Sequence, residues 1–383
     1  MTARDLPTTL AYDDRSASPG NASTPERRST VSTSRETPVS ENDCTFGLWY
    51  DFRNPARWPR SFSALYSEAL EQIAWAESLG LGSVWLTEHH FVEDGYTPSP
   101  FVLASAIGQR TTTMHIGTNL IVAPLHNPIR LAEDAATVSL LTGGRFDLGL
   151  GQGYWAPEFA AFGRELKQRP SLLEESIELI RRAWSGSREP YAGKRFTFPG
   201  IPVTPVPERI PRLLVGAMAD PAIERAARIG DGFLSTQNAH QQSYLDALER
   251  LGKPVEEGRI YAGQWAIIAD DPERTWARIG HHALYQINNY VAWGAFGPAD
   301  QVPQFADPDQ LVAGGAFTLW DPATAVDELT ALLRTRAQIK DVHFWAQLPG
   351  ESVDSGSERI EILATKVMPQ VRERLAAEAV VAG

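Results

Sequence analysis

The 383-residue chain is poor in the residue types that define several protein classes. It has one cysteine, Cys44, so no disulfide can form within the chain and cysteine-rich metal sites are excluded. No run of about 18 consecutive apolar residues occurs, so we expect no transmembrane helix. The formal net charge of −12 disfavours a nucleic-acid or anionic membrane surface. We therefore expect neither partner, and a reducing, cytoplasmic setting fits best.

The chain does have ample apolar material, since 43% of its residues are hydrophobic, and this predicts a large core. Residues 1–43 differ from the rest because they are rich in serine and threonine and show no periodic apolar face. They bury too little to offset their ordering entropy, which predicts a disordered tail. Their acidic residues and lack of an apolar run argue against a transit or signal peptide. We expect a tail over 1–43 and one folded domain over 44–383.

Short apolar runs alternate with helical periodicity after residue 44. The predicted strands are 46–50, 84–87, 115–122, 146–150, 213–217, 232–236, 260–269 and 342–346. Helices begin between them, because an N-cap residue precedes a proline at Asn127-Pro128, Asp220-Pro221, Asp271-Pro272 and Asp321-Pro322. Ser171 and Glu174 predict a further helix start as a capping box. This alternation predicts a (β/α)8 barrel, with a doubly wound sheet as the alternative.

The second strand ends in Glu88-His89-His90-Phe91, where a barrel places its chemistry. Adjacent side chains on a strand point to opposite faces, so His89 and His90 are not expected to hold one metal ion together. We predict no metal site and favour His89 as a catalytic acid or base at the barrel mouth. A structural polar pair is the alternative.

Three further strand ends are compatible with a bound ligand. Gly117 and Asn119 interrupt an apolar strand. This pattern is typical either of a bulge that binds a ligand or of an irregularity in the barrel. The glycines of 143–153 do not match a dinucleotide fingerprint, but they suit either close approach of a flat ligand or a tight turn. The strand over 213–217 leads into a helix whose N-terminus suits a phosphate, unless Asp220 caps it.

These segments together resemble one family. EHHF, IGTNLIVAPLHNPIRLAED, GGRFDLGLGQGYW and LLVGAMADPAIERAARIGDG occur in an order similar to that of bacterial luciferase-like, flavin-dependent monooxygenases, in particular the alkanal-monooxygenase-like branch. The likeness runs from about Phe46 to the C-terminal helix. It implies a (β/α)8 barrel that uses reduced FMN or, in one branch, a reduced deazaflavin. It also implies a lid late in the barrel, over 281–320.

The resemblance also assigns site residues. His89 matches the catalytic histidine, and Asn119–Leu120 falls where relatives have a non-proline cis peptide behind the flavin. Gln152 replaces a phosphate-binding arginine, and Tyr154 is a further phosphate candidate by analogy with other branches. The remaining cofactor-binding positions are Gly216, Ala217, Met218 and Ala219.

The activity implied by this resemblance is two-component oxygenation. A separate flavin reductase supplies reduced FMN, dioxygen forms a flavin carbon-4a peroxide, and a small apolar or aromatic substrate is oxygenated. Relatives form homodimers through helices that correspond to 61–79 and 98–109. The alternatives are a deazaflavin-dependent hydride-transfer enzyme and a non-catalytic flavin-binding protein on the same barrel.

Overall fold

The computed structural model describes residues 44–382, so the predicted tail over 1–43 lies outside the described residues. Within the described part, no helix is long and apolar enough to cross a membrane.

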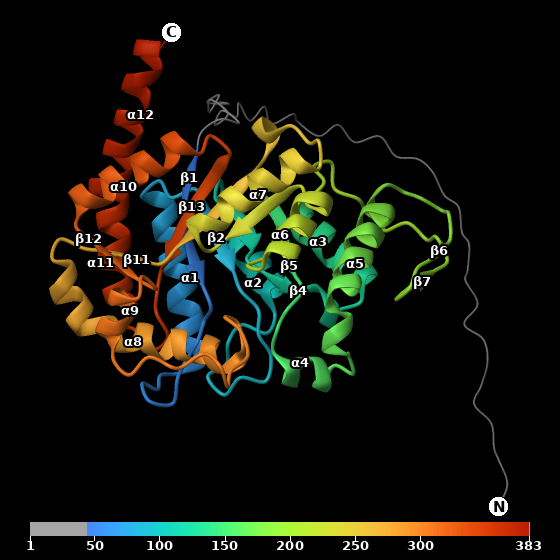
Figure 1. Ribbon diagram of the computed structural model, residues 1–383, viewed down its shortest axis with the longest axis horizontal. Coiled ribbons are helices and arrows are strands. Elements are labelled where there is room, and N and C mark those ends of the chain that lie inside the picture. Colours follow the sequence, from blue (N-terminus) through green and yellow to red (C-terminus); the bar gives the residue numbers. More distant parts are fainter. Residues whose placement is uncertain (1–43, 383) are drawn as a thin grey trace, which may run out of the picture. The chain divides into compact units, whose positions relative to one another are not determined.

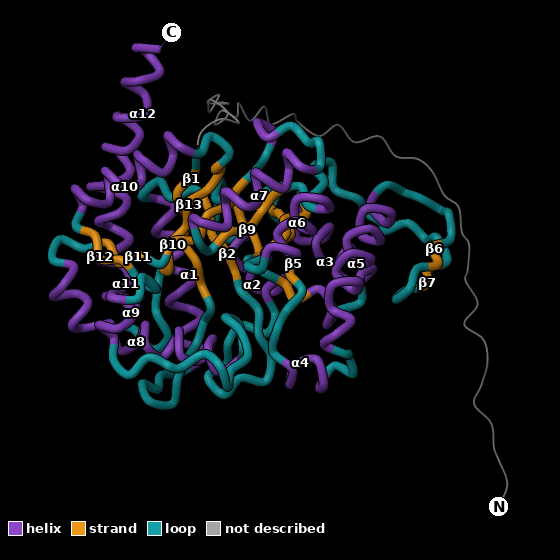
Figure 2. The backbone as a smooth tube through the Cα atoms, viewed as in Figure 1, coloured by secondary structure: helices purple, strands orange, loops and turns teal. Residues whose placement is uncertain are grey.

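Parallel strands form a closed barrel at the centre of the domain (Figure 2). The sheet runs in the order β3-β2-β1-β13-β10-β9-β8-β5-β4, and pairing between β3 and β5 closes it. Because β3 and β4 both pair with β5, they occupy one strand position of the barrel. The barrel therefore has eight strand positions, as predicted. The strands are β1 (Thr45–Tyr50), β2 (Ser83–Leu86), β3 (His115–Thr118), β4 (Ile121–Val122), β5 (Phe146–Gly151), β8 (Leu213–Gly216), β9 (Gly232–Ser235), β10 (Ile260–Gln264) and β13 (Ile339–Trp345). The closed sheet excludes the doubly wound alternative.

Helices surround the barrel, and the chain places a smaller group of elements at one end (Figure 1). The surrounding helices are α1 (Phe62–Ser78), α2 (Pro100–Gly108), α3 (Pro128–Leu141), α5 (Arg169–Trp184), α6 (Asp220–Ile229), α7 (Asn238–Arg250), α10 (Pro322–Thr335), α11 (Val353–Ile362) and α12 (Met368–Ala382). The end elements α4 (Ala156–Ala161) and α8 (Pro272–Trp293) lie opposite the end from which α12 projects. The chain also forms a short helix, α9 (Pro308–Ala313), and an antiparallel hairpin of β6 (Tyr191–Ala192) and β7 (Thr197–Phe198).

The predicted helix starts are confirmed at three of the proline sites. Asn127, Asp271 and Asp321 each accept a hydrogen bond from a backbone N–H of the first turn. Asp220 is a correction, because it is the first residue of α6 and Ala219 is the N-cap without a side-chain bond. Ser171 is a second correction, since α5 begins at Arg169 and the Ser171 hydroxyl donates to the carbonyl of Gln168.

Two predicted strands are interrupted, and both breaks shape the barrel mouth. The strand over 115–122 divides at a cis peptide between Asn119 and Leu120, the bond that the family resemblance implied. The strand over 260–269 divides at Trp265: β10 stays in the barrel, whereas β11 (Ala266–Ile268) pairs with β12 (Thr318–Trp320). The chain between β11 and β12 forms α8 and α9, where the late lid was expected.

A buried polar network, here called the paired cluster, crosses the barrel interior through Asp341, His343, Ser83, Trp85 and Asn119. The Asp341 carboxylate accepts hydrogen bonds from the Trp85 indole at 2.8 Å and from the Ser83 hydroxyl. His343 bonds Asp341 through Nδ1 at 2.7 Å and Asn119 through Nε2 at 3.0 Å. No polar side-chain atom of the five is buried without a partner, so the network meets its hydrogen-bonding requirement internally.

Candidate functional site

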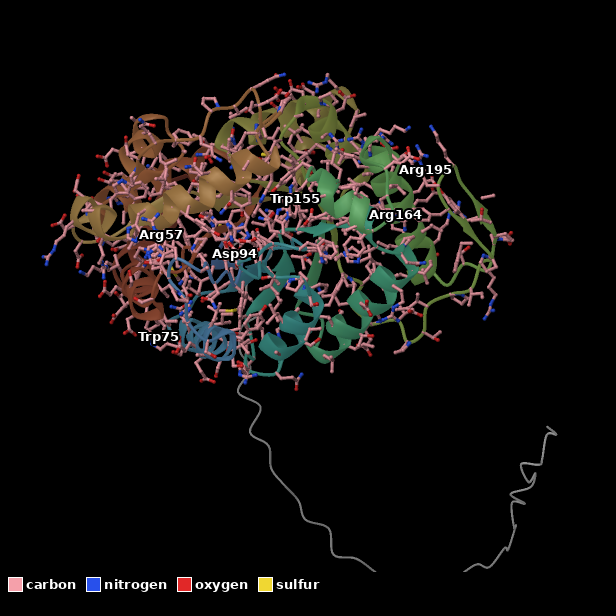
Figure 3. All side chains as sticks on the ribbon, turned by 90° about the horizontal axis from the view of Figure 1, so that it is seen from below. Arg57, Trp75, Asp94, Trp155, Arg164 and Arg195 are labelled. Atoms are coloured by element: carbon pink, nitrogen blue, oxygen red, sulfur yellow. The ribbon has the colours of Figure 1, made fainter. Side chains whose placement is uncertain are left out.

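The carboxyl ends of the barrel strands meet beneath α8 and α4, and the candidate site lies there. In the view onto this end, Asp94 and Trp155 lie toward the middle, whereas Arg195 lies at the periphery (Figure 3). Barrel enzymes place their catalytic groups at this face of the sheet. The residues at these strand ends are therefore the ones to consider first.

His89 follows β2 and is held by two side chains of the chain after β5. Its Nδ1 lies 2.9 Å from Glu158 Oε1, and its Nε2 lies 2.8 Å from the Tyr154 hydroxyl. An ionised carboxylate only accepts, so with Glu158 ionised Nδ1 carries the proton and Nε2 accepts from Tyr154. Burial raises the pKa of Tyr154 well above its usual range, which keeps that hydroxyl protonated. Glu158, His89 and Tyr154 therefore form a hydrogen-bonded chain, here called the relay.

Aromatic rings enclose this relay. The His89 ring packs against Tyr96 at 4.7 Å and Trp293 at 4.9 Å between ring centroids, with Trp155 and Tyr290 further out. The His89 side chain is only 6% exposed, and the Glu158 carboxylate is fully buried with no partner for Oε2. Four rings therefore keep bulk water from a histidine that carries acid–base capacity.

The His90 side chain joins a different network from that of His89, and both residues follow β2 rather than lying within it. Glu88 Oε1 lies 2.8 Å from His126 Nε2 and 3.3 Å from His90 Nε2. Burial opposes ionisation of Glu88, but His126 and His90 lower its pKa to about 2, and Glu88 in turn raises the pKa of His126. The three ligand-type atoms lie within 4.8 Å of one another. The opposite pKa shifts of Glu88 and His126 describe a carboxylate paired with an imidazole, and the His90 ring lies beside the same carboxylate.

The sequence reasoning missed a buried arginine beside the relay. Arg53 lies three residues past β1, its side chain is fully buried, and its Nε donates to Asp94 at 2.7 Å. Its guanidinium carbon lies 5.1–5.2 Å from the ring centroids of Tyr96, Tyr285 and Trp293. Nη1 and Nη2 are buried without a hydrogen-bond partner. We call His89, Glu158, Tyr154, Arg53 and Asp94 the mouth cluster.

Asp51 lies next to this cluster, directly after β1. Burial raises its pKa to about 7, against the opposing charge of Arg53. Its carboxylate accepts from the Arg53 backbone N–H and from Gln286 of α8. Phe52, between the two, has a φ of 55°, a left-handed conformation that is uncommon for a bulky residue. Barrel enzymes carry their catalytic groups at the carboxyl ends of the strands. Applied to the first strand, this rule would also have indicated Asp51 and Arg53.

On the other side of the mouth, the predicted flavin-contacting residues come together. Asn119 is held by His343, and the Leu120 side chain lies where a Cβ on Gly151 or Gly216 would be, at 2.6 and 2.5 Å. The glycines that end β5 and β8 thus make room for Leu120. Ala217 and Met218, which follow Gly216, are half-buried, and Ala219 is exposed.

A cation stands beside Gln152, although the sequence offered none there. Arg225 of α6 approaches Gln152 Oε1 to 3.5 Å through Nη1 and bonds Glu174 at 2.7 Å through Nε. Asp220 does not cap α6, but the N–H groups of Ala222 and Ile223 donate to the Ala219 carbonyl and Pro221 has none, so the first turn offers few N–H groups to another acceptor. The phosphate role of Gln152 stays a prediction, now with Arg225 as its neighbour. The Tyr154 hydroxyl is engaged by His89, and its phosphate role also stays a prediction.

Three tryptophan rings pack together near the carboxyl ends of the strands. Trp49 and Trp345 stack at 4.2 Å, and Trp265 packs edge-on at 5.9 Å from Trp49 and tilted at 5.4 Å from Trp345. The indole N–H groups of Trp49 and Trp345 are buried without a partner. A buried donor without a partner calls for an acceptor, and a flavin or deazaflavin ring carries several at its edge.

Comparisons with known proteins place this chain among luciferase-like proteins. A family model described as luciferase-like monooxygenase matches residues 45–319. An F420-dependent glucose-6-phosphate dehydrogenase from Amycolatopsis mediterranei is 32% identical over 215 residues, which are 54% of this chain. The match spans 63% of that relative's length.

Solved structures share the barrel. A monooxygenase from Streptomyces bottropensis superposes with a TM-score of 0.70 at 23% identity, over 85% of this chain and 99% of that one. The oxygenating constituent of 3,6-diketocamphane monooxygenase from Pseudomonas putida, in complex with FMN, gives 0.68 at 17%, over 86% and 99%. These likenesses show the fold. The family model covers most of the described chain, and the protein therefore belongs to the luciferase-like monooxygenase family.

Proposed function

We propose that this protein is a monooxygenase that uses reduced FMN, supplied by a separate reductase, and dioxygen to oxygenate a small flat or apolar substrate. The observation that carries the proposal is the relay of Glu158, His89 and Tyr154 inside an aromatic enclosure. A bound reduced flavin supplies the electrons and activates the dioxygen. The protein contributes position, dryness and a proton.

The residues present could hold the flavin on two sides. Leu120 and Asn119 would lie against the ring, where the unpartnered indoles of Trp49 and Trp345 offer donors. Gln152 and Arg225 would meet the phosphate, because a guanidinium favours an anion.

The relay can move a proton without admitting water. Glu158 fixes the tautomer and orientation of His89, so Nε2 can take a proton from Tyr154 or return one to it. Tyr154 is then the outermost group of the relay, and His89 acts through it. Excluding water from this step favours oxygen transfer over loss of the oxygen as hydrogen peroxide.

The experiment is a stopped-flow oxidation of enzyme-bound reduced FMN by dioxygen. The proposal expects a lag between oxygen consumption and the return of oxidised-flavin absorbance, with less hydrogen peroxide than free reduced FMN produces. Simultaneous oxygen uptake and flavin oxidation, with full peroxide yield, would reject it. A protein that binds FMN but shows neither the lag nor the lower hydrogen peroxide yield would be a non-catalytic flavin-binding protein.

A second candidate is F420-dependent hydride transfer, which the name of the Amycolatopsis mediterranei relative favours. A histidine anchored by a carboxylate suits removal of an alcohol proton as hydride leaves the same carbon. Competitive titration with reduced FMN and with F420 separates the candidates: tighter binding of F420, and its reduction by an alcohol, would favour this one.

A further inference from the structure

The donors of Arg53 are the least satisfied buried groups at the barrel mouth. One of its three nitrogens bonds Asp94, while Nη1 and Nη2 have no partner and the side chain is fully buried. A buried donor without a partner destabilises the folded protein, and a charged donor does so more strongly than a neutral one. Such a cost is recovered when a ligand supplies the missing acceptors.

Arg53 and His89 share aromatic neighbours. Tyr96 and Trp293 each contact the His89 ring, and each also lies 5.2 Å from the Arg53 guanidinium carbon. A ligand that reaches Nη1 and Nη2 therefore lies against the same rings as the relay. Trp293 is half-buried and is the last residue of α8, and Gly294 follows it in a left-handed conformation with a φ of 85°. It is the enclosing ring best placed to move for an entering molecule.

We propose that Arg53 anchors the carboxylate of an aromatic substrate, whose ring packs on Trp293 and Tyr96 beside the relay. This inference rests on the proposed function and narrows its substrate class. The two Nη donors match the two oxygens of a carboxylate, which a guanidinium binds in a bidentate manner. The rings supply the flat apolar contact that an aromatic acid requires.

The charges around Arg53 allow one more anion when Asp51 is protonated. Asp94 neutralises the guanidinium, so an ionised Asp51 would repel an incoming carboxylate. Burial raises the Asp51 pKa to about 7, hence this group can take up a proton as the ligand enters. The other groups facing Asp51 are Gln286 and Tyr290 of α8 and Tyr96, all uncharged because burial also raises the pKa of both tyrosines. Binding should therefore weaken as the pH rises through about 7.

Calorimetric titration of the full chain with benzoate and with benzamide tests the proposal. Benzoate is expected to bind at least about tenfold more tightly than benzamide, because the carboxylate gains charge-assisted bonds. In Arg53→Met this preference disappears. Arg53→Lys keeps a charge for Asp94 but loses the planar fork, and should weaken benzoate about tenfold while leaving benzamide unchanged. Asp51→Asn should remove the pH dependence of benzoate binding.

Arg57→Met is the matched control. Arg57 is four residues further along the same segment, is exposed, and also stacks on a tryptophan, with 5.2 Å to the Trp58 ring. Its loss should leave benzoate binding unchanged. Equal affinity for benzoate and benzamide in the wild type, or full benzoate affinity in Arg53→Lys, would overturn the proposal. Should Arg53→Met fail to fold, the wild-type preference and Arg53→Lys decide the outcome.

Reduced FMN binding and its oxidation lag are measured on the same samples. A normal lag without a preference for benzoate would overturn this inference and leave the monooxygenase proposal standing. A preference for benzoate without any lag would support the carboxylate site at Arg53 and reject the monooxygenase proposal.

Discussion

The barrel contains two buried polar networks that differ in one respect. In the paired cluster around Asp341, no buried polar side-chain atom lacks a partner. In the mouth cluster, Glu158 Oε2 and two nitrogens of Arg53 lack one. All members of both networks except the half-buried Tyr154 are buried, so burial alone does not distinguish them. The difference teaches that unmet hydrogen-bonding capacity marks the place for a ligand, whereas a satisfied network stabilises the barrel.

Replacing His89 by alanine should give the largest functional effect. A positioned acid or base contributes about 10²–10⁴-fold to rate, so product formation should fall by that factor while the protein stays folded. His90→Ala is the control, because the His90 side chain pairs with Glu88, whereas its backbone N–H, which alanine keeps, is what bonds Glu158 of the relay. This variant should alter stability more than rate. Single-turnover kinetics with preloaded reduced FMN measure both. Wild-type rates in His89→Ala would remove the histidine from the reaction.

Asp341→Asn tests the other side of the comparison. Removing the charge from a carboxylate that holds His343 and Trp85 should cost about 3–5 kcal/mol in the free energy of unfolding. Glu158→Gln keeps one acceptor for His89 and should cost less than about 1.5 kcal/mol. Urea unfolding of the two variants gives both values. Equal losses would erase the distinction between the clusters.

The cation beside Gln152 should matter for cofactor affinity. Arg225→Gln is expected to weaken reduced FMN about tenfold, because a charge-assisted bond to the phosphate is lost. Arg228→Gln is the matched control: Arg228 also bonds Glu174, at 2.8 Å, but has no bond to Gln152. Anaerobic titration measures the affinities. If both variants bind FMN as the wild type does, the phosphate lies elsewhere.

The two shifted carboxyls near the mouth should give opposite pH dependences of stability. The Asp51 pKa rises from 3.8 to about 7 on folding, so its contribution to the free energy of unfolding falls as the pH rises across that window. The Glu88 pKa falls from 4.5 to about 2, so its contribution is lost as the pH drops across that range.

Variants separate these two contributions. Asp51→Asn should remove the fall in stability that accompanies a rise in pH from 3.8 to about 7, and Glu88→Gln the fall that accompanies a drop in pH from 4.5 to about 2. Urea unfolding at a series of pH values measures each. A variant with an unchanged pH profile would show that its carboxyl is not shifted.

The smallest expected effect concerns association. We propose the homodimer implied by the family, through α1 and α2, where Phe62 and Val102 are 46% and 69% exposed. Val102→Asp should raise the dissociation constant, since it places a charge in an apolar contact. Light scattering at micromolar protein measures the mass. A monomeric wild type would contradict this proposal.

Much of the barrel was predictable because strand and helix periodicity are local properties. All eight barrel strands and three proline-linked helix starts followed from neighbouring residues. The N-caps lie at Ala219 instead of Asp220 and at Gln168 instead of Ser171, which are shifts of one and three residues that tertiary contacts decide.

The partners in the site were less accessible to sequence reasoning. Glu158 meets His89 across 69 residues, and Arg225 meets Gln152 across 73. Such pairs depend on how the strand ends converge, and neither residue stands in a motif that signals the contact. Arg53 differs, because it follows a strand end directly and could have been found there.

The most direct test of the central claim is a crystal structure of the protein with FMN. The account predicts an isoalloxazine ring in contact with Leu120 on one side and the His89–Tyr154 relay on the other, with its phosphate near Arg225. It also predicts that the indole N–H groups of Trp49 or Trp345 gain an acceptor. A flavin bound away from the mouth cluster, with Arg53 and Glu158 unchanged in their surroundings, would contradict it.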